Sequence, residues 1–396
     1  MTPLLDLEDA QQRLLAMAAP TQGETIAVES AAGRYLAEPL LARRTQPSHP
    51  LSAMDGWAVR GADMPGPWTI AGESAAGHPF AEEVDAGRAV RISTGAIVPP
   101  GADAVLVQEE CRRDGNTLHF AGTAPDPLSR HIRPRGLDFT EGSVLLSAGA
   151  RLSPAALALA IGGGHGTVPV RRRPRVTILD CGDELRAPGE PLGPGDLPAS
   201  NGPMLTAMCG ELPCDVTRRG PVADEREALL AAFGTADDAD LVITSGGASV
   251  GDHDLIRPTL ESMGAELAFW RVAMKPGKPV MVARRGRQIV LGLPGNPVSC
   301  FVTAFLFALP LIRAMNGCTN PLPTAQTMPL RGSLEPVGKR AEFIRARIHE
   351  GMVEPLRLQD SGAIAPLAVA DALIVRPAHA KCIQNGDDVP IFRLYG

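Results

Sequence analysis

Glycines, hydroxyls and carboxylates occur together in the stretch TSGGASVGDHD, residues 244–254, which follows the largely apolar run ADLVI. A glycine-rich loop after a buried strand is typical of phosphate binding, yet this one lacks the lysine of a nucleoside-triphosphate loop. Asp252 and Asp254 stand there instead, and a carboxylate beside a phosphate cradle usually holds Mg²⁺. Helix N-capping is the commonest alternative role for such aspartates, but Pro258 can start a helix one turn later and leaves Asp254 available.

Two more loops have comparable content at the predicted ends of strands. CGDEL, residues 181–185, follows the apolar strand RVTILD and contains Asp183 and Glu184. GLPGNPVS, residues 292–299, turns from a strand into a helix through Asn296 as cap and Pro297 at the first helical position. One glycine turn alone is usually structural, because only glycine tolerates the required backbone angles. Three such loops at the carboxyl edge of one parallel sheet predict a ligand site, in which helix-start amides bind an anion.

A lysine pair and two turns complete the polar inventory. AMKPGKPV holds Lys275 and Lys278 around a Pro-Gly turn, which suits an oxyanion or a phosphate, although exposed turn lysines are normally only solvated. Asp55 in SAMDGWAV and Thr94 in RISTGAIVPPG, taken alone, fit ordinary turns. The eight histidines are dispersed without an HExxH motif, so none is given a chemical role.

The elements that must position these residues predict a multidomain α/β plus β protein. Strands alternate with helices of about ten residues over 174–319, which indicates a central α/β domain with a mostly parallel sheet. Asn201, Asp224 and Pro258 are expected at the starts of its helices. Short β-prone runs predict an inserted β domain over 46–135, and alternating β runs predict a C-terminal β-barrel domain over 320–396 without helices. Residues 1–45 plus 136–173 are expected to form a helical N-terminal domain around the insertion.

Composition and charge exclude several classes of function. With 44 acidic and 38 basic residues and only 4% aromatic residues, the chain is poorly suited to bind nucleic acid. Seven scattered cysteines without a CxxC pair favour a reducing cytoplasm over a disulfide framework or structural zinc. The N-terminus carries acidic residues where a signal peptide is basic. The apolar run Val298 to Ile312 is short for a bilayer span and contains Pro310, so no membrane association is expected.

Taken together and in order, these motifs resemble a known family. SAMDGWAV, RISTGAIVPPGADAVLVQEE, GDEL, TSGGASVGDHD, KPGKPV and GLPGNPVS are similar to the motifs of the MoeA-type molybdopterin molybdenumtransferases, which include the E domain of gephyrin. The resemblance implies that molybdenum from molybdate is inserted into adenylylated molybdopterin with Mg²⁺-dependent release of AMP. It also implies an elongated homodimer of four-domain chains, in which the inserted β domain of one chain completes the site of the other. The molybdopterin adenylyltransferase and the cofactor-receiving enzymes are further implied partners.

The resemblance also implies residue roles. Asp55, Thr94 and Asp138 look like the partner-chain contribution to the site. The metal and nucleotide side is implied to comprise Asp183, Glu184, Asp224, Ser249 and Asp254, with Asp183 and Asp254 as metal ligands. The anion pocket and the oxyanion contacts are implied to comprise Lys275, Lys278, Pro294, Asn296, Pro297, Ser299, Arg345 and Ser361.

Three positions depart from the family pattern, and two alternative functions stay open. Asp180-Cys181 stands where the family often has Ser-Thr, which puts a hydroxyl contact in doubt. Arg271 replaces a common lysine, and Trp57 replaces the usual tyrosine or phenylalanine. A molybdopterin adenylyltransferase would resemble the α/β domain only. A non-enzymatic, gephyrin-like scaffold would not need to keep Asp55, Glu184 and Asp254 together.

Overall fold

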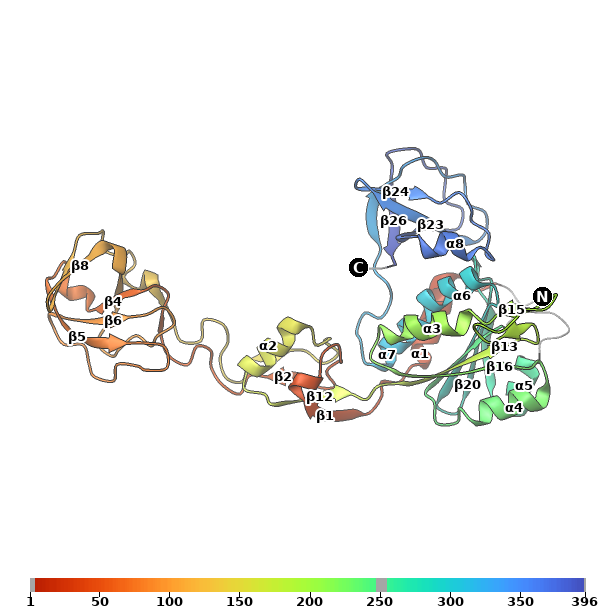
Figure 1. Ribbon diagram of the computed structural model, residues 1–396, viewed down its shortest axis with the longest axis horizontal. Coiled ribbons are helices and arrows are strands. Elements are labelled where there is room, and N and C mark those ends of the chain that lie inside the picture. The colour runs from red at the N-terminus through yellow and green to blue at the C-terminus, as the bar shows by residue number, and fades with distance from the viewer. Residues whose placement is uncertain (1–3, 247–254, 395–396) are drawn as a thin grey trace.

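The protein is elongated, with β structure at one end and a central α/β unit at the other (Figure 1). The computed structural model describes residues 4–246 and 255–394. A narrow middle section built of short strands and one helix joins the two ends. The β-rich C-terminal part lies beside the α/β unit, so the two ends of the molecule differ in architecture as well as in size.

The α/β unit contains a six-stranded mixed sheet that is mostly parallel. The strand order is β16-β13-β17-β21-β20-β18. The first four strands are mutually parallel, whereas β20 and β18 each run antiparallel to their inner neighbour. The bounds are β13 (Arg175–Cys181), β16 (Asp215–Val222), β17 (Leu241–Ser245), β18 (Glu266–Arg271), β20 (Pro279–Arg285) and β21 (Gln288–Leu293). The predicted parallel strands are confirmed, and their carboxyl ends meet at one edge of the sheet.

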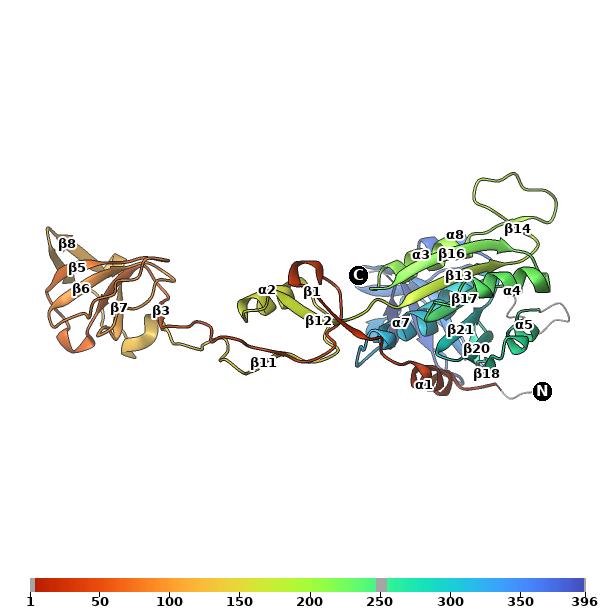
Figure 2. The same ribbon diagram turned by 90° about the horizontal axis from the view of Figure 1, so that it is seen from below.

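Helices cover both faces of this sheet (Figure 2). Buried side chains of α4 and α5 form one hydrophobic cluster, and those of α1, α3 and the helix from α6 to α7 form the other. The bounds are α1 (Leu7–Met17), α3 (Asn201–Gly210), α4 (Arg226–Gly234), α5 (Ile256–Ser262), α6 (Pro297–Thr303), η5, a π-helical turn (Ala304–Ala308), and α7 (Leu309–Met315). Both β17 and β21 are buried at every position between these two layers, and most of their residues are apolar.

The most apolar segment is one continuous helix rather than the short run expected. Pro297–Met315 spans 19 residues and is long and apolar enough to cross a membrane by composition alone. However, 89% of its most apolar window is buried inside the protein. Pro310 lies at the second position of α7, directly after the π-helical turn, where the chain continues as a helix. The hydropathy of this segment is therefore that of a core helix.

The expectation of a helical N-terminal domain is wrong. This region is largely β: β1 (Gly23–Ala27) pairs with β12 (Thr167–Arg171), and β2 (Leu40–Leu41) pairs with β11 (Val144–Leu146). Its one α-helix in the described residues is α2 (Pro154–Gly162), while α1 packs on α7 and η5 of the α/β unit. The segments before and after the insertion do pair, but through extended backbone: Val168 and Val170 alternate with more exposed residues, as in a half-buried strand.

The inserted β unit has a six-stranded sheet of order β7-β4-β6-β5-β9-β8. Its strands are β4 (Gly56–Val59), β5 (Trp68–Ser74), β6 (Arg88–Ile92), β7 (Ala104–Val107), β8 (Cys111–Asp114) and β9 (Thr117–Phe120). The chain enters through β3 (Leu51–Ser52) and leaves through β10 (Ile132–Arg133), which pair with each other. These strands lie within residues 46–135, where short β-prone runs were expected.

The C-terminal sheet has the order β19-β23-β25-β26-β22, and β24 also pairs with β23. An isolated bridge between Leu330 and Val353 joins the end of β22 to β24, which closes the strands into a ring. The bounds are β19 (Met274–Lys275), β22 (Gln326–Pro329), β23 (Ala341–His349), β24 (Met352–Pro355), β25 (Ala372–Arg376) and β26 (Asp388–Arg393). Helix α8 (Ile364–Ala368) corrects the expectation that no helix follows Asn320. The exact domain boundaries stay a prediction.

Candidate active site

A cavity of about 660 Å³ lies at the carboxyl edge of the central sheet. Strand ends, two helix starts and a loop of the C-terminal part contribute its walls. The lining residues include Asp180, Gly182, Glu184, Asn201, Asp224, Ser245, Gly246, Pro294, Gly295, Asn296, Pro297, Gly362 and Ile364. The predicted loops after β13 and β21 therefore meet in one cavity, and Glu184, Asp224, Pro294, Asn296 and Pro297 of the predicted set line it.

Three carboxylates gather at the ends of β13 and β16. Asp183 Oδ1 accepts a hydrogen bond of 2.9 Å from the backbone N–H of Asp224. Burial first, and then the negative charges of Asp183 and Glu184, raise the pKa of the Asp224 carboxyl. Across residues 4–246 and 255–394, none of the three forms an ion pair with a lysine, arginine or histidine. Asp224 is also not a helix cap, since α4 begins two residues later without a side-chain cap.

The described residues do not form a complete metal site by themselves. Among them, no three His, Cys, Asp or Glu side chains converge in a way that could hold a metal ion. Ser249 and Asp254 lie outside the described residues, so their predicted placement is not addressed. Carboxylates near a phosphate site commonly share Mg²⁺ with water and phosphate oxygens, for which a partial protein ligand set suffices.

The turn from β21 into α6 is fixed by contacts from two directions. Asn296 is the N-cap and Pro297 the first helical residue, as predicted, but the Asn296 side chain does not cap the helix. Its Nδ2 donates instead to Ser361 Oγ at 3.2 Å, and the N–H of Val298 donates to the Ser361 carbonyl at 3.1 Å. Ser299 is buried in the first turn of α6. The C-terminal loop containing Ser361 thus lies directly against this helix start.

Arg345 holds the same C-terminal loop. Its guanidinium donates to the carbonyls of Ala363 at 2.8 Å and Asp360 at 2.9 Å, and its side chain is almost fully buried. Burial lowers the pKa of this guanidinium. These donors are directed to the loop on both sides of Ser361, and the oxyanion contact of Arg345 stays a prediction.

The two lysines of the Pro-Gly turn have different surroundings. Lys275 belongs to β19, and its Nζ lies 3.2 Å from Glu342 Oε1 on the neighbouring strand β23. Lys278 is exposed and forms no ion pair within the described residues. Pro279, the next residue, lines the cavity. The two lysines are therefore not held together. Lys275 contacts the neighbouring strand, whereas Lys278 lies next to a cavity residue and has no ion-pair partner in the described part of the chain.

Asp55, Thr94 and Asp138 lie in a different part of the molecule. Asp55 Oδ1 accepts hydrogen bonds from the backbone N–H of Thr94 at 2.6 Å and from its hydroxyl at 2.9 Å. The backbone bond, followed by the hydroxyl bond, holds the pKa of Asp55 below its ordinary value. Asp55 precedes β4 and Thr94 follows β6. Both strands belong to the inserted β unit, at the end of the molecule away from the α/β unit (Figure 1). Asp138 follows β10. Within one chain these residues do not reach the cavity.

Sequence reasoning missed two polar residues of the cavity. Asp180 was noted only as a departure, yet it is fully buried, and its Oδ2 accepts from Arg218 Nε at 2.8 Å. Asn201 was expected to cap α3, but it lies inside the helix and its Nδ2 donates to the Gly295 carbonyl at 2.7 Å. The available signal was an ionisable residue in the last positions of an otherwise apolar strand.

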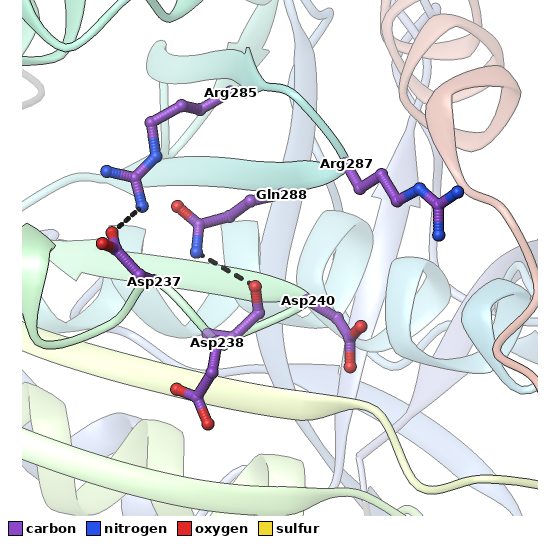
Figure 3. A pocket seen from close by; sticks show the side chains of 7 residues that line it. Asp237, Asp238, Asp240, Arg285, Arg287 and Gln288 are labelled. Atoms are coloured by element: carbon purple, nitrogen blue, oxygen red, sulfur yellow. Dashed lines mark hydrogen bonds and ion pairs between the residues drawn. The ribbon is translucent and has the colours of Figure 1, made fainter.

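A second cavity, of about 480 Å³, lies at the opposite edge of the sheet (Figure 3). It is lined by Asp237, Asp238 and Asp240, by Arg285 and Arg287, and by Gln288. Each aspartate is paired: Asp237 with Arg285 at 2.6 Å, Asp238 with Arg175 at 3.2 Å and Asp240 with Arg172 at 2.9 Å. The acidic charge of this cavity is therefore neutralised, while Arg287 has no ion-pair partner among the described residues.

Comparison with protein families accounts for most of the chain. Residues 5–164 match the MoeA N-terminal region (domain I and II), residues 177–314 match a probable molybdopterin binding domain, and residues 327–394 match the MoeA C-terminal region (domain IV). The matches to the N- and C-terminal regions favour a molybdenumtransferase over the adenylyltransferase alternative, which explains the α/β domain only.

Individual relatives agree. A molybdopterin molybdenumtransferase of Haemophilus influenzae is 39% identical over 319 residues, which cover 79% of this chain and 78% of the relative. Another from Nostoc sp. is 35% identical, covering 94% of this chain and 88% of the relative. The crystal structure of the molybdopterin biosynthesis protein MoeA from Pyrococcus horikoshii superimposes with a TM-score of 0.86 at 26% identity, covering 99% of this chain and 100% of that one.

Proposed function

Because the chain belongs to the MoeA family and is a molybdopterin molybdenumtransferase of molybdenum cofactor biosynthesis, we propose that the cavity at the carboxyl edge of its central sheet is where the reaction occurs. The observation that carries this assignment is a pair of cavity-lining carboxylates, Glu184 and Asp224, with Asp183 bonded to the Asp224 N–H; none of the three has an ion-pair partner among the described residues, and the pKa of Asp224 is raised. Perturbed carboxylates beside an open cavity are typical of functional sites.

The proposed substrates are adenylylated molybdopterin and molybdate, and the proposed products are the molybdenum cofactor and AMP. The starts of α3 and α6 line the cavity, and helix-start N–H groups favour the phosphate oxygens of such a substrate. Pro294, Asn296 and Pro297 shape the wall in which these N–H groups lie. A pyrophosphate next to the carboxylates would in turn require a cation between them.

The proposed cation is Mg²⁺, held by Asp183 and Asp254 together with substrate phosphate oxygens. The residues present fit it, because Asp183, Glu184 and Asp224 repel one another and a divalent cation would relieve that repulsion. Bound Mg²⁺ would neutralise charge on the phosphoanhydride and polarise its phosphorus centre. Asp224 orients Asp183 through its backbone N–H, and Glu184 is available to accept a proton from an attacking water.

The proposed oxyanion site is formed by Lys278, Ser361 and Ser299 near the start of α6. Lys278 supplies a positive charge that no described carboxylate occupies, and Ser361 presents a hydroxyl beside Asn296. Arg345 acts indirectly by fixing the 359–363 loop, and Lys275 joins β19 to the C-terminal sheet through Glu342. The molybdate would thus lie at the junction of the α/β and C-terminal parts.

The remaining proposed groups come from a second chain. Asp55, Thr94 and Asp138 lie in the elongated arm, away from the cavity of their own chain, which supports a homodimer in which each arm completes the partner's site. The seven cysteines lie in the described residues without forming a disulfide, in keeping with a proposed cytoplasmic location. The molybdopterin adenylyltransferase and cofactor-receiving enzymes remain proposed partners.

The activity is tested by supplying purified protein with adenylylated molybdopterin and measuring AMP. Release should require both molybdate and Mg²⁺, and it should stop when a chelator removes the cation. AMP release that proceeds equally without molybdate would contradict the coupling of metal insertion to hydrolysis.

A further inference from the structure

Asp180 is an incompletely satisfied carboxylate in the cavity wall. It lies in β13 with no solvent exposure, its Oδ2 accepts from Arg218 Nε at 2.8 Å, and its Oδ1 has no hydrogen-bond partner among residues 4–246 and 255–394. A Cβ at Gly202 would lie 2.0 Å from Asp180 Oδ2 and 2.5 Å from Arg218 Nε, so this ion pair occupies space that only glycine leaves. Because buried carboxylate oxygens normally have partners, the vacant acceptor calls for a donor from the cavity side.

Asn201 presents a second acceptor to the same cavity. Its side chain is about nine-tenths buried, and its Nδ2 donates to the Gly295 carbonyl at 2.7 Å. That bond fixes the amide orientation, since a carbonyl oxygen can only accept. Asn201 Oδ1 is therefore also an acceptor without a partner in the described part of the chain, and both residues line the cavity.

Two acceptors select against the anionic parts of the substrate. Phosphate, molybdate and thiolate groups have no proton to donate at neutral pH and would be repelled by a carboxylate. A ring edge with several N–H groups has the complementary chemistry. A pterin has a ring N–H next to an exocyclic amino group, whereas adenine has an amino group flanked only by acceptor nitrogens.

We propose that Asp180 and Asn201 form an acceptor pair that recognises the N–H-bearing edge of the pterin ring. This inference rests on the proposed function, because it assumes that the pterin enters this cavity. It gives the Asp180 departure from the family's Ser-Thr pattern a role: a carboxylate acceptor, paired with Arg218 in a buried place, replaces a hydroxyl.

The first test needs no variant and compares two fluorescent ligands. In 6-hydroxymethylpterin the exocyclic group is a donor, whereas 6-hydroxymethyl-lumazine has an acceptor oxygen at that place. The unmodified protein should bind the pterin about ten- to a hundredfold more tightly, since a mismatched group leaves the buried acceptors unpaired. Equal affinities, or binding of neither ligand, would overturn the inference.

The second test reverses the preference with Asp180→Asn. Arg218 Nε can only donate, so the new amide must turn its oxygen toward Arg218 and its NH₂ toward the position of Oδ1. An acceptor becomes a donor, and pterin affinity should fall about tenfold or more while lumazine affinity rises. Asp240→Asn is the matched control, because it also removes a carboxylate from an arginine pair but at the opposite edge of the sheet. Its pterin-to-lumazine ratio should stay at the original value.

A third experiment, with nucleotides, tests whether the N–H group that binds Asp180 and Asn201 comes from the pterin or from adenine. AMP has an exocyclic amino group where inosine monophosphate has an oxygen, which is the same change as from pterin to lumazine. Asp180→Asn should leave the ratio of their affinities unchanged. A change in that ratio with the pterin ratio unaltered would overturn the pterin assignment in favour of adenine. Molybdate-dependent AMP release by the unmodified protein is measured on the same preparation, so a failure of the proposed activity is seen independently of the ligand preference.

Discussion

Both edges of the central sheet carry acidic side chains, but the two edges differ in whether arginine partners neutralise them. At the amino edge, Asp237, Asp238 and Asp240 each have an arginine partner within about 3 Å, so the negative charge of the aspartates is neutralised there. At the carboxyl edge, Asp183, Glu184 and Asp224 have no ion-pair partner among residues 4–246 and 255–394, and the pKa of Asp224 is raised. We therefore propose that a bound ligand relieves the repulsion among the carboxylates at the carboxyl edge. The ion pairs at the amino edge need no ligand for this.

The sharpest test of this comparison is one substitution at each edge. Glu184→Gln should lower turnover by at least about a hundredfold, because it removes a group for proton transfer without changing the side-chain size. It should leave the melting temperature unchanged or slightly higher, since one repulsive charge is lost. Asp240→Asn should do the reverse, lowering the free energy of unfolding by about 1 kcal/mol with unchanged turnover. Thermal melts and AMP release measure both, and similar losses of turnover for the two variants would break the comparison.

A second test asks whether the carboxyl edge is sufficient within one chain. Asp55→Ala and Asp224→Ala should each be inactive alone, because they remove opposite halves of the proposed shared site. After subunit exchange, about half of the dimers are mixed and each has one intact site, so about a quarter of normal activity should return. Native mass spectrometry verifies the exchange. If mixed dimers form and remain inactive, both residues serve the same chain.

A third test compares the two lysines beside that edge. Lys278→Ala should raise the molybdate concentration for half-maximal turnover by about ten- to a hundredfold, the effect of losing one charge-assisted contact. Affinity for adenylylated molybdopterin should change little. Lys275→Ala should have the smaller effect on molybdate, because its ammonium group is engaged by Glu342. Tungstate, with similar size and charge, should compete in the unmodified protein, and a weakened pterin affinity in Lys278→Ala would instead assign the lysine to the phosphates.

The smallest expected effect is a difference in titration between Asp224 and Asp55. The Asp224 carboxyl should titrate above the ordinary aspartate pKa, so its penalty to folding is present at neutral pH and disappears as the pH falls through the folded pKa toward the unfolded one. Asp55 should titrate below it, and its favourable contribution is lost as the pH falls through its lowered folded pKa. Carbon NMR of labelled aspartates measures both, with Asp224→Asn and Asp55→Asn assigning the signals. Coincident titrations would remove the electrostatic contrast.

The parts of the fold that follow local patterns were predictable from the sequence. Buried strands such as β13 and β17 contain short apolar runs, and Asn296-Pro297 marks the start of α6. The middle section was not predictable, because β2 and β11 are only two and three residues long and are defined by their pairing partners. Helix α1 shows the same limit: its helical period was visible, but its docking on α7 was not.

The candidate site likewise has features that local sequence predicts and features that depend on tertiary contacts. Glycine loops and carboxylates at strand ends indicated the cavity, because parallel topology brings strand ends together. The roles of Asn201 and Arg345 could not be predicted, since each depends on carbonyls that are distant in sequence or arranged by a loop. Asn201 contacts Gly295, which is 94 residues away. The local sequence predicted that Asn201 caps α3, whereas its side chain contacts the Gly295 carbonyl instead.

The strand β19 has a consequence for how this protein can be divided or recombined. Met274 and Lys275 pair with Ala341 and Glu342, so a segment far upstream supplies the edge of the C-terminal sheet. A fragment of residues 320–396 would expose that edge of β23 as unpaired N–H and C=O groups, which invites self-association. The C-terminal sheet therefore includes a strand from outside residues 320–396. Exchanging it between homologues should require the KPGK turn to travel with it.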